Sequence, residues 1–344
     1  MNDREIVTPT GHGRPSPTML SIVVPAYNEG EALRAFHKRL WAVLIDLPME
    51  KEIIYVNDGS SDNTLDIMRE LRQGQGNVAI VDLSRNFGKE IAMTAGLDHA
   101  RGDAIVIIDA DLQDPPELIP DLLNGWREGY DVVYAKRVSR QGESVIKKLT
   151  AYLFYRLIKR VTRIDIPEDT GDFRLLSRRA VEALGQLKEQ HRFMKGLFAW
   201  IGYSQKAVLY QRDSRYAGRS SWNYWRLWNF ALEGITSFTI APLKLATYLG
   251  AMTAVGAFGY AMRIIYKTLV YGEPVRGWPS MMVVVLFLGG IQLITLGIIG
   301  EYLGRMFEET KQRPLYLVKE FRPTVAHLDS IHDGVTAEPR YSLR

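Results

Sequence analysis

Two carboxylate side chains stand directly after an apolar stretch in the first third of the chain. The stretch AIVII (104–108) is followed by Asp109, Ala110 and Asp111, and Gln113 comes two residues later. Carboxylates in an Asp-x-Asp arrangement can hold Mg²⁺ or Mn²⁺ through hard oxygen ligands, and such a cation bridges diphosphate oxygens. The tripeptide is common by chance, so its meaning depends on the elements around it. It indicates chemistry on a substrate that carries a diphosphate.

Polar residues follow three other apolar runs in the same way. These polar stretches are Pro25-Ala26-Tyr27-Asn28-Glu29, Asn57-Asp58-Gly59-Ser60 and Ser84-Arg85-Asn86. A single aspartate at such a place often only caps a helix or closes a turn. Several carboxylates at one edge of a sheet favour a binding site instead.

The absence of other motifs narrows the chemistry. The sequence has no cysteine, which excludes disulfides, zinc–thiolate sites and cysteine nucleophiles. It also lacks a Gly-x-x-x-x-Gly-Lys-Ser phosphate loop, a Gly-x-Gly-x-x-Gly after the first apolar run, a Gly-x-Ser-x-Gly elbow and a His-x-x-x-His pair. An ATPase, a dinucleotide oxidoreductase and a serine hydrolase are therefore disfavoured. The net charge of +4 suits contact with acidic lipid or phosphate, and we expect no nucleic-acid partner.

The elements that must position these residues alternate between strand and helix patterns over residues 20–135. LSIVVPA (20–26) is typical of a buried parallel strand, and residues 28–47 have the spacing of an amphipathic helix. The same alternation repeats until YDVVYAKR (130–137), which closes the series. It predicts an α/β fold with a doubly wound, mostly parallel sheet, in which ligands bind beyond the carboxyl ends of the strands.

Two long uncharged runs lie in the last third of the chain. Eighteen residues separate Lys244 from Arg263, and 24 separate Arg276 from Glu301. A spanning helix needs about 20 apolar residues, so we predict a transmembrane hairpin with helices at about 243–265 and 279–303. The alternative is a helical hairpin buried in a soluble core. Lysine and arginine flank both outer ends of the hairpin, which predicts that both termini are cytoplasmic.

Two further segments are amphipathic. Residues 143–163 predict a basic helix that can lie on an anionic bilayer or serve as an ordinary domain helix. Trp222, Trp225 and Trp228 precede the first apolar run and favour an interfacial helix over a buried stripe. Residues 1–19 are polar and predict a disordered lead, and the sequence shows no periodicity after about residue 322.

Six motifs, in this order, resemble those of family 2 glycosyltransferases of the dolichyl-phosphate mannose synthase type. They are VVPAYNEG, VNDGSSDNT, LSRNFGKEIAMTAGLDHARGD, DADLQDPPE, EDTGDFRLLSRR and YAGRSS. Residues 167–204 and the hairpin ending LGIIGEYLGRMFEETKQRPLYLV are similar to the bacterial polyisoprenyl-phosphate (bactoprenol) glucosyltransferases, which carry two C-terminal spans. The resemblance covers about residues 20–320.

The resemblance implies a GT-A fold and an inverting, metal-dependent transfer of a hexose to a polyprenyl phosphate. It implies a cytoplasmic catalytic domain at 20–219, an interfacial helix region at 220–241, transmembrane helices within 242–304, a cytoplasmic tail at 305–344 and a place in the bacterial inner membrane. Asp172 matches the proposed catalytic aspartate of the family; from the residues alone it could also pair with Arg174 or cap a helix. The implied nucleotide-sugar site comprises Pro25, Ala26, Tyr27, Glu29, Asp58, Asp109, Ala110, Asp111 and Arg137, and the implied metal ligands are Asp109, Asp111 and Gln113.

One loop departs from the family pattern. Relatives often have Gly-Glu-Ser-Lys where this chain has Gly218-Arg219-Ser220-Ser221, so the usual lysine is missing. We expect Arg215, Arg219 and Ser220 to contact acceptor or donor phosphate there, with Arg219 replacing the missing charge.

The sequence leaves the donor sugar, the class of protein and the oligomeric state open. UDP-glucose is the expected donor and Mg²⁺ or Mn²⁺ the expected cofactor, but GDP-mannose or a modified sugar remains an alternative donor. A processive polysaccharide synthase is disfavoured because the Gln-x-x-Arg-Trp motif is missing and two spans cannot enclose a polymer path. A non-catalytic membrane scaffold that only binds a nucleotide sugar is the alternative from another class. Gly300 and Gly304 suit helix packing, either against the first span or in a homo-oligomer.

Overall fold

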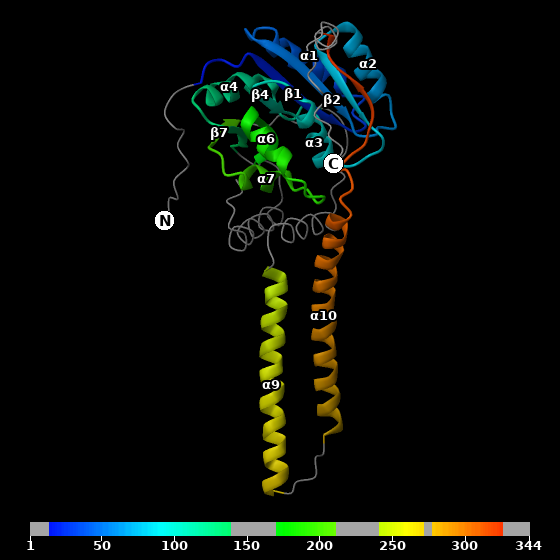
Figure 1. Ribbon diagram of the computed structural model, residues 1–344, viewed down its shortest axis with the longest axis vertical. Helices are drawn as coiled ribbons and strands as arrows, with labels where there is room; N and C mark the ends of the chain where they lie inside the picture. The colour runs from blue at the N-terminus through cyan, green and yellow to red at the C-terminus, as the bar shows by residue number, and fades with distance from the viewer. Residues whose placement is uncertain (1–13, 139–169, 211–240, 272–276, 326–344) are drawn as a thin grey trace. The chain divides into compact units, whose positions relative to one another are not determined.

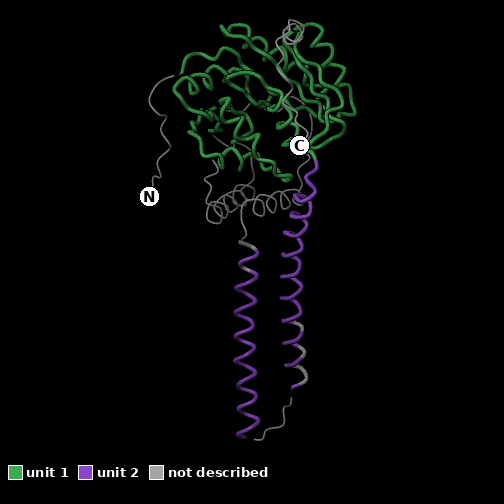
Figure 2. The backbone as a smooth tube through the Cα atoms, in the orientation of Figure 1, with its two compact units in different colours: residues 1–155, 164–223, 314–344 green, residues 156–163, 224–313 purple. Residues whose placement is uncertain are grey.

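The computed structural model describes residues 14–138, 170–210, 241–271 and 277–325 (Figure 1). The chain divides into two compact units (Figure 2). The first comprises residues 1–155, 164–223 and 314–344, and the second comprises residues 156–163 and 224–313.

The first unit is built on an eight-stranded sheet with the order β7-β5-β6-β4-β1-β2-β3-β8. β6 and β8 run antiparallel to their neighbours, and the other strands run parallel to one another. The predicted α/β, mostly parallel sheet is therefore confirmed. The strands are β1 (Met19–Ala26), β2 (Glu50–Asn57), β3 (Val78–Leu83), β4 (Ala104–Ile107), β5 (Val132–Arg137), β6 (Thr170–Ser177), β7 (Gln205–Tyr210) and β8 (Val318–Arg322).

Helices cover both faces of this sheet, as a doubly wound fold requires. On one face, alternate residues of β1 such as Ile22 join a core with Phe36 and Leu40 of α1. On the other, a Cβ added at Gly96 of α3 would lie 2.2 Å from Val23 Cγ1, so glycine allows this helix to press against the sheet. The helices are α1 (Leu33–Leu44), α2 (Thr64–Gly74), α3 (Lys89–His99), the 3₁₀ turn η1 (Pro116–Leu118), α4 (Ile119–Arg127), α6 (Arg178–Gln186) and α7 (Met194–Trp200).

Strand β6 lies between β4 and β5, although it follows both in the sequence. The sequence predicts a sheet that closes with residues 130–137, and the structure adds β6 and β7 after that point. Because β6 is antiparallel, its first residues lie at the edge where the parallel strands end. This placement brings Asp172, the third residue of β6, to the predicted site edge.

Residues near both ends of the chain make contacts with the first unit. At the N-terminal end, the Arg14 guanidinium lies 2.7 Å from the buried carboxylate of Asp131, inside the predicted disordered lead. At the C-terminal end, the predicted tail contributes β8, which pairs with β3. The segment VKEFR is short and rich in charged side chains, which suits an edge strand. The same composition explains why the sequence alone does not predict a strand there.

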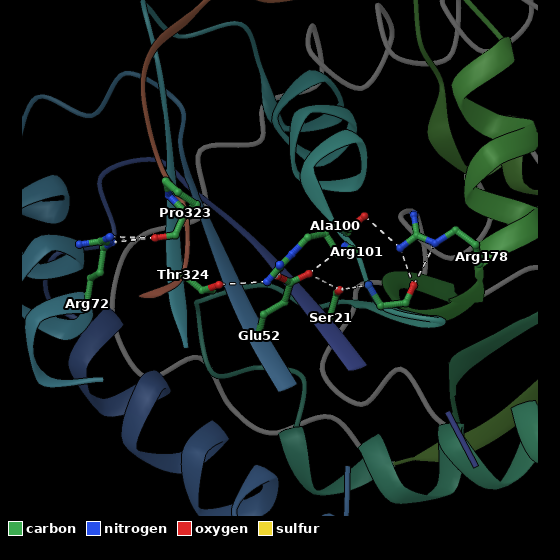
Figure 3. A network of polar contacts seen from close by, with 9 residues as sticks. Ser21, Glu52, Arg72, Ala100, Arg101, Arg178, Pro323 and Thr324 are labelled. Carbon is green, nitrogen blue, oxygen red and sulfur yellow. Dashed lines mark hydrogen bonds and ion pairs between the residues drawn. The ribbon is translucent and has the colours of Figure 1, made fainter. Parts of the chain in front are cut away.

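A polar network holds the residues after β8 at the edge of the sheet where the parallel strands begin, opposite their carboxyl ends (Figure 3). Its centre is Glu52, buried in β2, which accepts hydrogen bonds from Ser21 Oγ at 2.6 Å and from Arg101 Nε at 3.0 Å. Arg101 Nη2 also donates to Thr324 Oγ1 at 2.9 Å, and Arg72 donates to the Pro323 carbonyl. A buried carboxylate is tolerated only when it is paired, so this network stabilises the return of the chain to the sheet.

The second unit contains two long apolar helices, α9 (Ala241–Tyr271) and α10 (Trp278–Thr310), which lie side by side (Figures 1 and 2). Their candidate spanning segments, Ala246–Tyr271 and Val283–Thr310, are long and apolar enough to cross a membrane, and the described residues do not bury them. A pair of apolar helices with exposed side chains does not fit the alternative of a buried soluble hairpin. At Gly300 and Gly304 an added Cβ would meet no described atom within 4 Å, so these glycines do not mark the contact with α9.

Candidate functional site

The loops that follow β1, β2 and β3 are tied together at the carboxyl edge of the sheet. Asp58, buried just after β2, accepts hydrogen bonds from the backbone N–H groups of Phe87 at 2.7 Å and Gly88 at 3.0 Å. A Cβ added at Gly59 would lie 2.5 Å from Asn86 N, so only glycine permits this approach. Asp58 therefore shapes the rim by holding the loop before α3; its predicted contact with nucleobase or ribose stays a prediction.

Two of the three described non-glycine residues with a positive φ lie at the same rim. Asn28 after β1 and Leu112 after β4 have φ angles of 55° and 59°, which non-glycine residues seldom adopt. The Leu112 conformation allows the Gln113 N–H to donate to Asp111 Oδ1 at 3.1 Å. Strained non-glycine residues persist where the surrounding structure holds them, and they gather at ligand sites.

The remaining predicted nucleotide-binding residues lie at the end of β1. Pro25 and Ala26 are buried in the strand, whereas Tyr27 has 48% of its surface exposed. The Glu29 N–H donates to Thr64 Oγ1 at 2.9 Å, which links this loop to the start of α2. An exposed aromatic ring beside a strained loop can stack on a base.

Lys89 joins the two aspartates that the sequence assigns to metal binding and to catalysis. Its Nζ lies 2.6 Å from Asp109 Oδ2 and 2.5 Å from Asp172 Oδ2. The second oxygen of each aspartate, Oδ1, is buried and has no hydrogen-bond partner among the residues that the structure describes. The carboxylate of Asp172 thus pairs with Lys89, while Arg174 donates to the backbone carbonyls of Gly171 and Asp172.

The charges around Asp172 keep it ionised. Burial alone raises the pKa of an aspartate, but here Lys89, followed by Lys195, outweighs that cost and holds the pKa of Asp172 well below its usual range. The pKa of Lys89 is raised by Asp109 and Asp172 against the opposing effect of its own burial. A carboxylate with such a low pKa is a weak base, so its charge and its geometry matter more than its proton affinity.

Arg137 reaches the site from the end of β5. Its Nε donates to the hydroxyl of Tyr210 at 3.3 Å, and that hydroxyl donates to the buried carboxylate of Asp114. Burial, followed by Asp114, raises the pKa of Tyr210, so the hydroxyl stays protonated at neutral pH. Asp114 belongs to the loop that begins at Asp109, so Tyr210 connects the loop of the predicted metal ligands with Arg137 at the end of β5.

The donor set fits a divalent cation that takes most of its ligands from substrate. Asp109 and Asp111 supply oxygens, Ala110 between them is buried, and the unpartnered Asp109 Oδ1 is available as a ligand. Within the described part of the chain, no group of three or more His, Asp or Glu residues could hold a metal ion. Mg²⁺ is often bound by one or two carboxylates together with substrate phosphates, which matches this arrangement.

Sequence reasoning missed several residues of the site and named others that fall outside the described ranges. The missed residues are Lys89, Glu90, Asp114, Lys195 and Tyr210. The position of Lys89 directly after Gly88, at the start of the helix that follows a strand, was the only signal. Arg215, Arg219, Ser220 and the predicted helices at 143–163 and 220–240 lie outside the residues that the structure describes.

Glu90 gives the site a measurable pH dependence. Its Oε2 accepts the Met194 N–H at 2.9 Å, and burial, followed by Asp172, raises its pKa from 4.5 to about 7. Between these values the folded state holds more protons than the unfolded state, so stability falls as the pH rises from 4.5 to 7.

We expect Glu90→Gln to keep the Met194 bond and to raise Tm at pH 8, by about 2–4 °C for each kcal/mol recovered. At pH 5, where folded Glu90 is already protonated, the variant and the wild type should differ little. Thermal unfolding at pH 5 and 8 tests this, with the exposed Glu182→Gln as the control. A Tm difference from wild type that is equal at both pH values would contradict it.

Comparisons with known proteins agree with this layout. The model of glycosyl transferase family 2 matches residues 21–185, and that of the GtrB C-terminal hairpin matches residues 241–306. An uncharacterised glycosyltransferase of Synechocystis is 56% identical over 301 residues, which are 88% of this chain and 95% of the relative. The bactoprenol glucosyl transferase of Shigella phage SfX is 48% identical over 300 residues, 87% of this chain and 98% of the relative. Glucosyl-3-phosphoglycerate synthase from Mycobacterium tuberculosis has a TM-score of 0.45 and 21% identity over 64% of this chain and 76% of its own.

Proposed function

The chain belongs to glycosyl transferase family 2, and on that premise we propose that it transfers a glucosyl group from UDP-glucose to a polyprenyl phosphate at a membrane surface. The relatives named bactoprenol glucosyl transferase support both the sugar and the lipid. The two apolar helices support a lipid substrate, because they keep the chain in the membrane where such an acceptor resides.

One observation carries the proposal. Asp109 from the loop after β4 and Asp172 from β6 both contact Lys89, at the edge of the sheet where nucleotide ligands bind in open α/β folds. Each aspartate keeps one buried oxygen that has no hydrogen-bond partner among the described residues. A donor diphosphate beside Asp109 therefore places its sugar near Asp172.

The acceptor needs little activation. A phosphate monoester is already anionic near neutral pH, since its second pKa is about 6. One of its oxygens attacks the anomeric carbon from the face opposite the diphosphate, the bond from that carbon to the diphosphate oxygen breaks, and UDP leaves. Positioning supplies much of such a rate enhancement. Asp172, held as an anion by Lys89, orients the sugar or the acceptor, and its lowered pKa makes it a poor acceptor for a residual proton.

Positively charged groups stabilise the leaving diphosphate in the proposed reaction. A divalent cation, when bound, neutralises the charge that grows on the diphosphate. Asp109, Asp111 and Gln113 are the residues that would hold it. Arg137, held by Tyr210, would face the same phosphates. The phosphate contacts predicted for Arg215, Arg219 and Ser220 stay predictions, because these residues lie outside the described part of the chain.

The orientation follows from charge and substrate. Lysine and arginine flank the outer ends of the hairpin, which favours cytoplasmic termini. Nucleotide sugars are made in the cytoplasm, so the catalytic unit belongs on that side of a bacterial inner membrane. A homo-oligomer held by the exposed Gly300 face stays a prediction.

A transfer assay tests the proposal. Membranes containing the full chain are incubated with undecaprenyl phosphate and, separately, labelled UDP-glucose, GDP-mannose and other nucleotide sugars, with and without a chelator. We expect one labelled lipid, formed from UDP-glucose, lost with chelator, carrying a single inverted glucose. A product from another sugar would change the donor, several sugars per lipid would indicate a processive synthase, and nucleotide binding without transfer would indicate a scaffold.

A further inference from the structure

Tyr210 lies beside Arg137 because of the register of two strands. β5 and β7 pair in parallel, and Arg137 and Tyr210 are the last partners in that register. The Val138 N–H donates to the Tyr210 carbonyl at 3.0 Å, which continues the pairing one residue further. Partners in a parallel register present their side chains to the same face, so the contact between guanidinium and phenol is fixed by the backbone.

The tyrosine hydroxyl is itself held by a buried carboxylate. Asp114 has 1% of its surface exposed and accepts the Tyr210 O–H through Oδ1. When a hydroxyl donates to a carboxylate, its oxygen becomes a better acceptor, so the bond from Arg137 Nε is strengthened. The hydroxyl thus donates to Asp114 and accepts from Arg137, and its removal leaves both residues without this partner.

This chain of bonds ends next to the catalytic aspartate. A Cβ added at Gly171 would lie 3.4 Å from Arg137 Nη2 and 3.6 Å from Asp114 Oδ2. Both groups therefore pack against the backbone of the residue that precedes Asp172. A guanidinium has five N–H donors, and the bond to Tyr210 uses only the Nε donor.

We infer that Tyr210 is a positioning residue for the donor diphosphate: its hydroxyl, anchored by Asp114, fixes the Arg137 guanidinium so that its Nη groups meet the phosphates. This rests on the proposed function, which places the diphosphate between Asp109 and Arg137. An unanchored arginine loses much rotamer freedom when it binds phosphate, and an anchored one has already lost it. The side-chain conformational entropy of Arg137 is therefore lost during folding, so binding of the diphosphate does not have to include this loss.

The test removes only the hydroxyl. Tyr210→Phe in the full chain should weaken binding of UDP in the presence of Mn²⁺ about tenfold, measured by calorimetry, and raise KM for the donor similarly, with KM for the lipid acceptor unchanged. Tyr316→Phe is the matched control, because its hydroxyl donates to a carboxylate, Asp98 at 2.7 Å, outside the site. It should bind UDP like the wild type.

A double-mutant cycle separates positioning from plain stability. In an Arg137→Ala background, Tyr210→Phe should cost little further UDP affinity, because the group that it positions is gone. Unchanged UDP affinity in Tyr210→Phe, or an equal loss with and without Arg137, overturns the inference. A wild-type chain that binds UDP but transfers no sugar refutes the proposed function alone, because the binding comparison does not depend on transfer.

Discussion

Replacing Asp172 with asparagine is expected to lower kcat about 10²- to 10³-fold while leaving the binding of UDP and Mn²⁺ near the wild-type value. The substitution keeps the shape of the side chain and removes its charge. Asp172 is the third residue of the antiparallel strand β6, and its carboxylate pairs with Lys89, so we expect the reaction to use its charge. Single-turnover transfer to the lipid phosphate measures the loss.

The same substitution also removes a partner of Lys89 and Lys195, so stability must be measured alongside. Both lysines lower the pKa of Asp172, and both lose an attractive charge in Asp172→Asn. The exposed Asp46→Asn is the matched control for an aspartate-to-asparagine change. A folded Asp172→Asn variant with near-normal turnover would remove Asp172 from the catalytic residues.

The strand ends of the site were predictable because local signals define them. Each buried run, such as residues 20–26, ends in polar residues, and parallel strands bring their carboxyl ends to one edge. Asp109 and Asp58 could therefore be placed on a common rim without a structure. The strained turn at Leu112 could not be predicted, because a leucine gives no indication in the sequence of a positive φ.

The pairing of Lys89 with Asp172 depends on long-range topology. β6 inserts between β4 and β5, and nothing in a local pattern states which strand a distant segment will join. Asp172 was assigned by resemblance alone, and its lysine partner was not assigned at all. β8 was not predicted for another reason. A short strand with charged side chains at a sheet edge has the composition of a solvated tail.

Replacing Asp109 with asparagine is expected to produce the complementary defect, a loss of metal-supported donor binding. The amide keeps an oxygen but carries no charge, and hard divalent cations favour anionic oxygens. We expect the Kd for UDP in the presence of Mn²⁺ to rise at least about tenfold, a loss of about 1.4 kcal/mol, and the dependence on Mn²⁺ concentration to shift upward. Calorimetric titration with and without Mn²⁺ measures both.

Comparison of the two aspartates decides whether the site works as proposed. Both contact Lys89, so a defect that came only from releasing this lysine would be the same in Asp109→Asn and Asp172→Asn. If Asp109 holds the cation, only its variant loses the effect of Mn²⁺ on UDP binding, while the exposed Asp121→Asn changes nothing. Equal Mn²⁺ responses in the two site variants would mean that the cation binds elsewhere, and the role of Asp109 would then be to fix Lys89 beside Asp172.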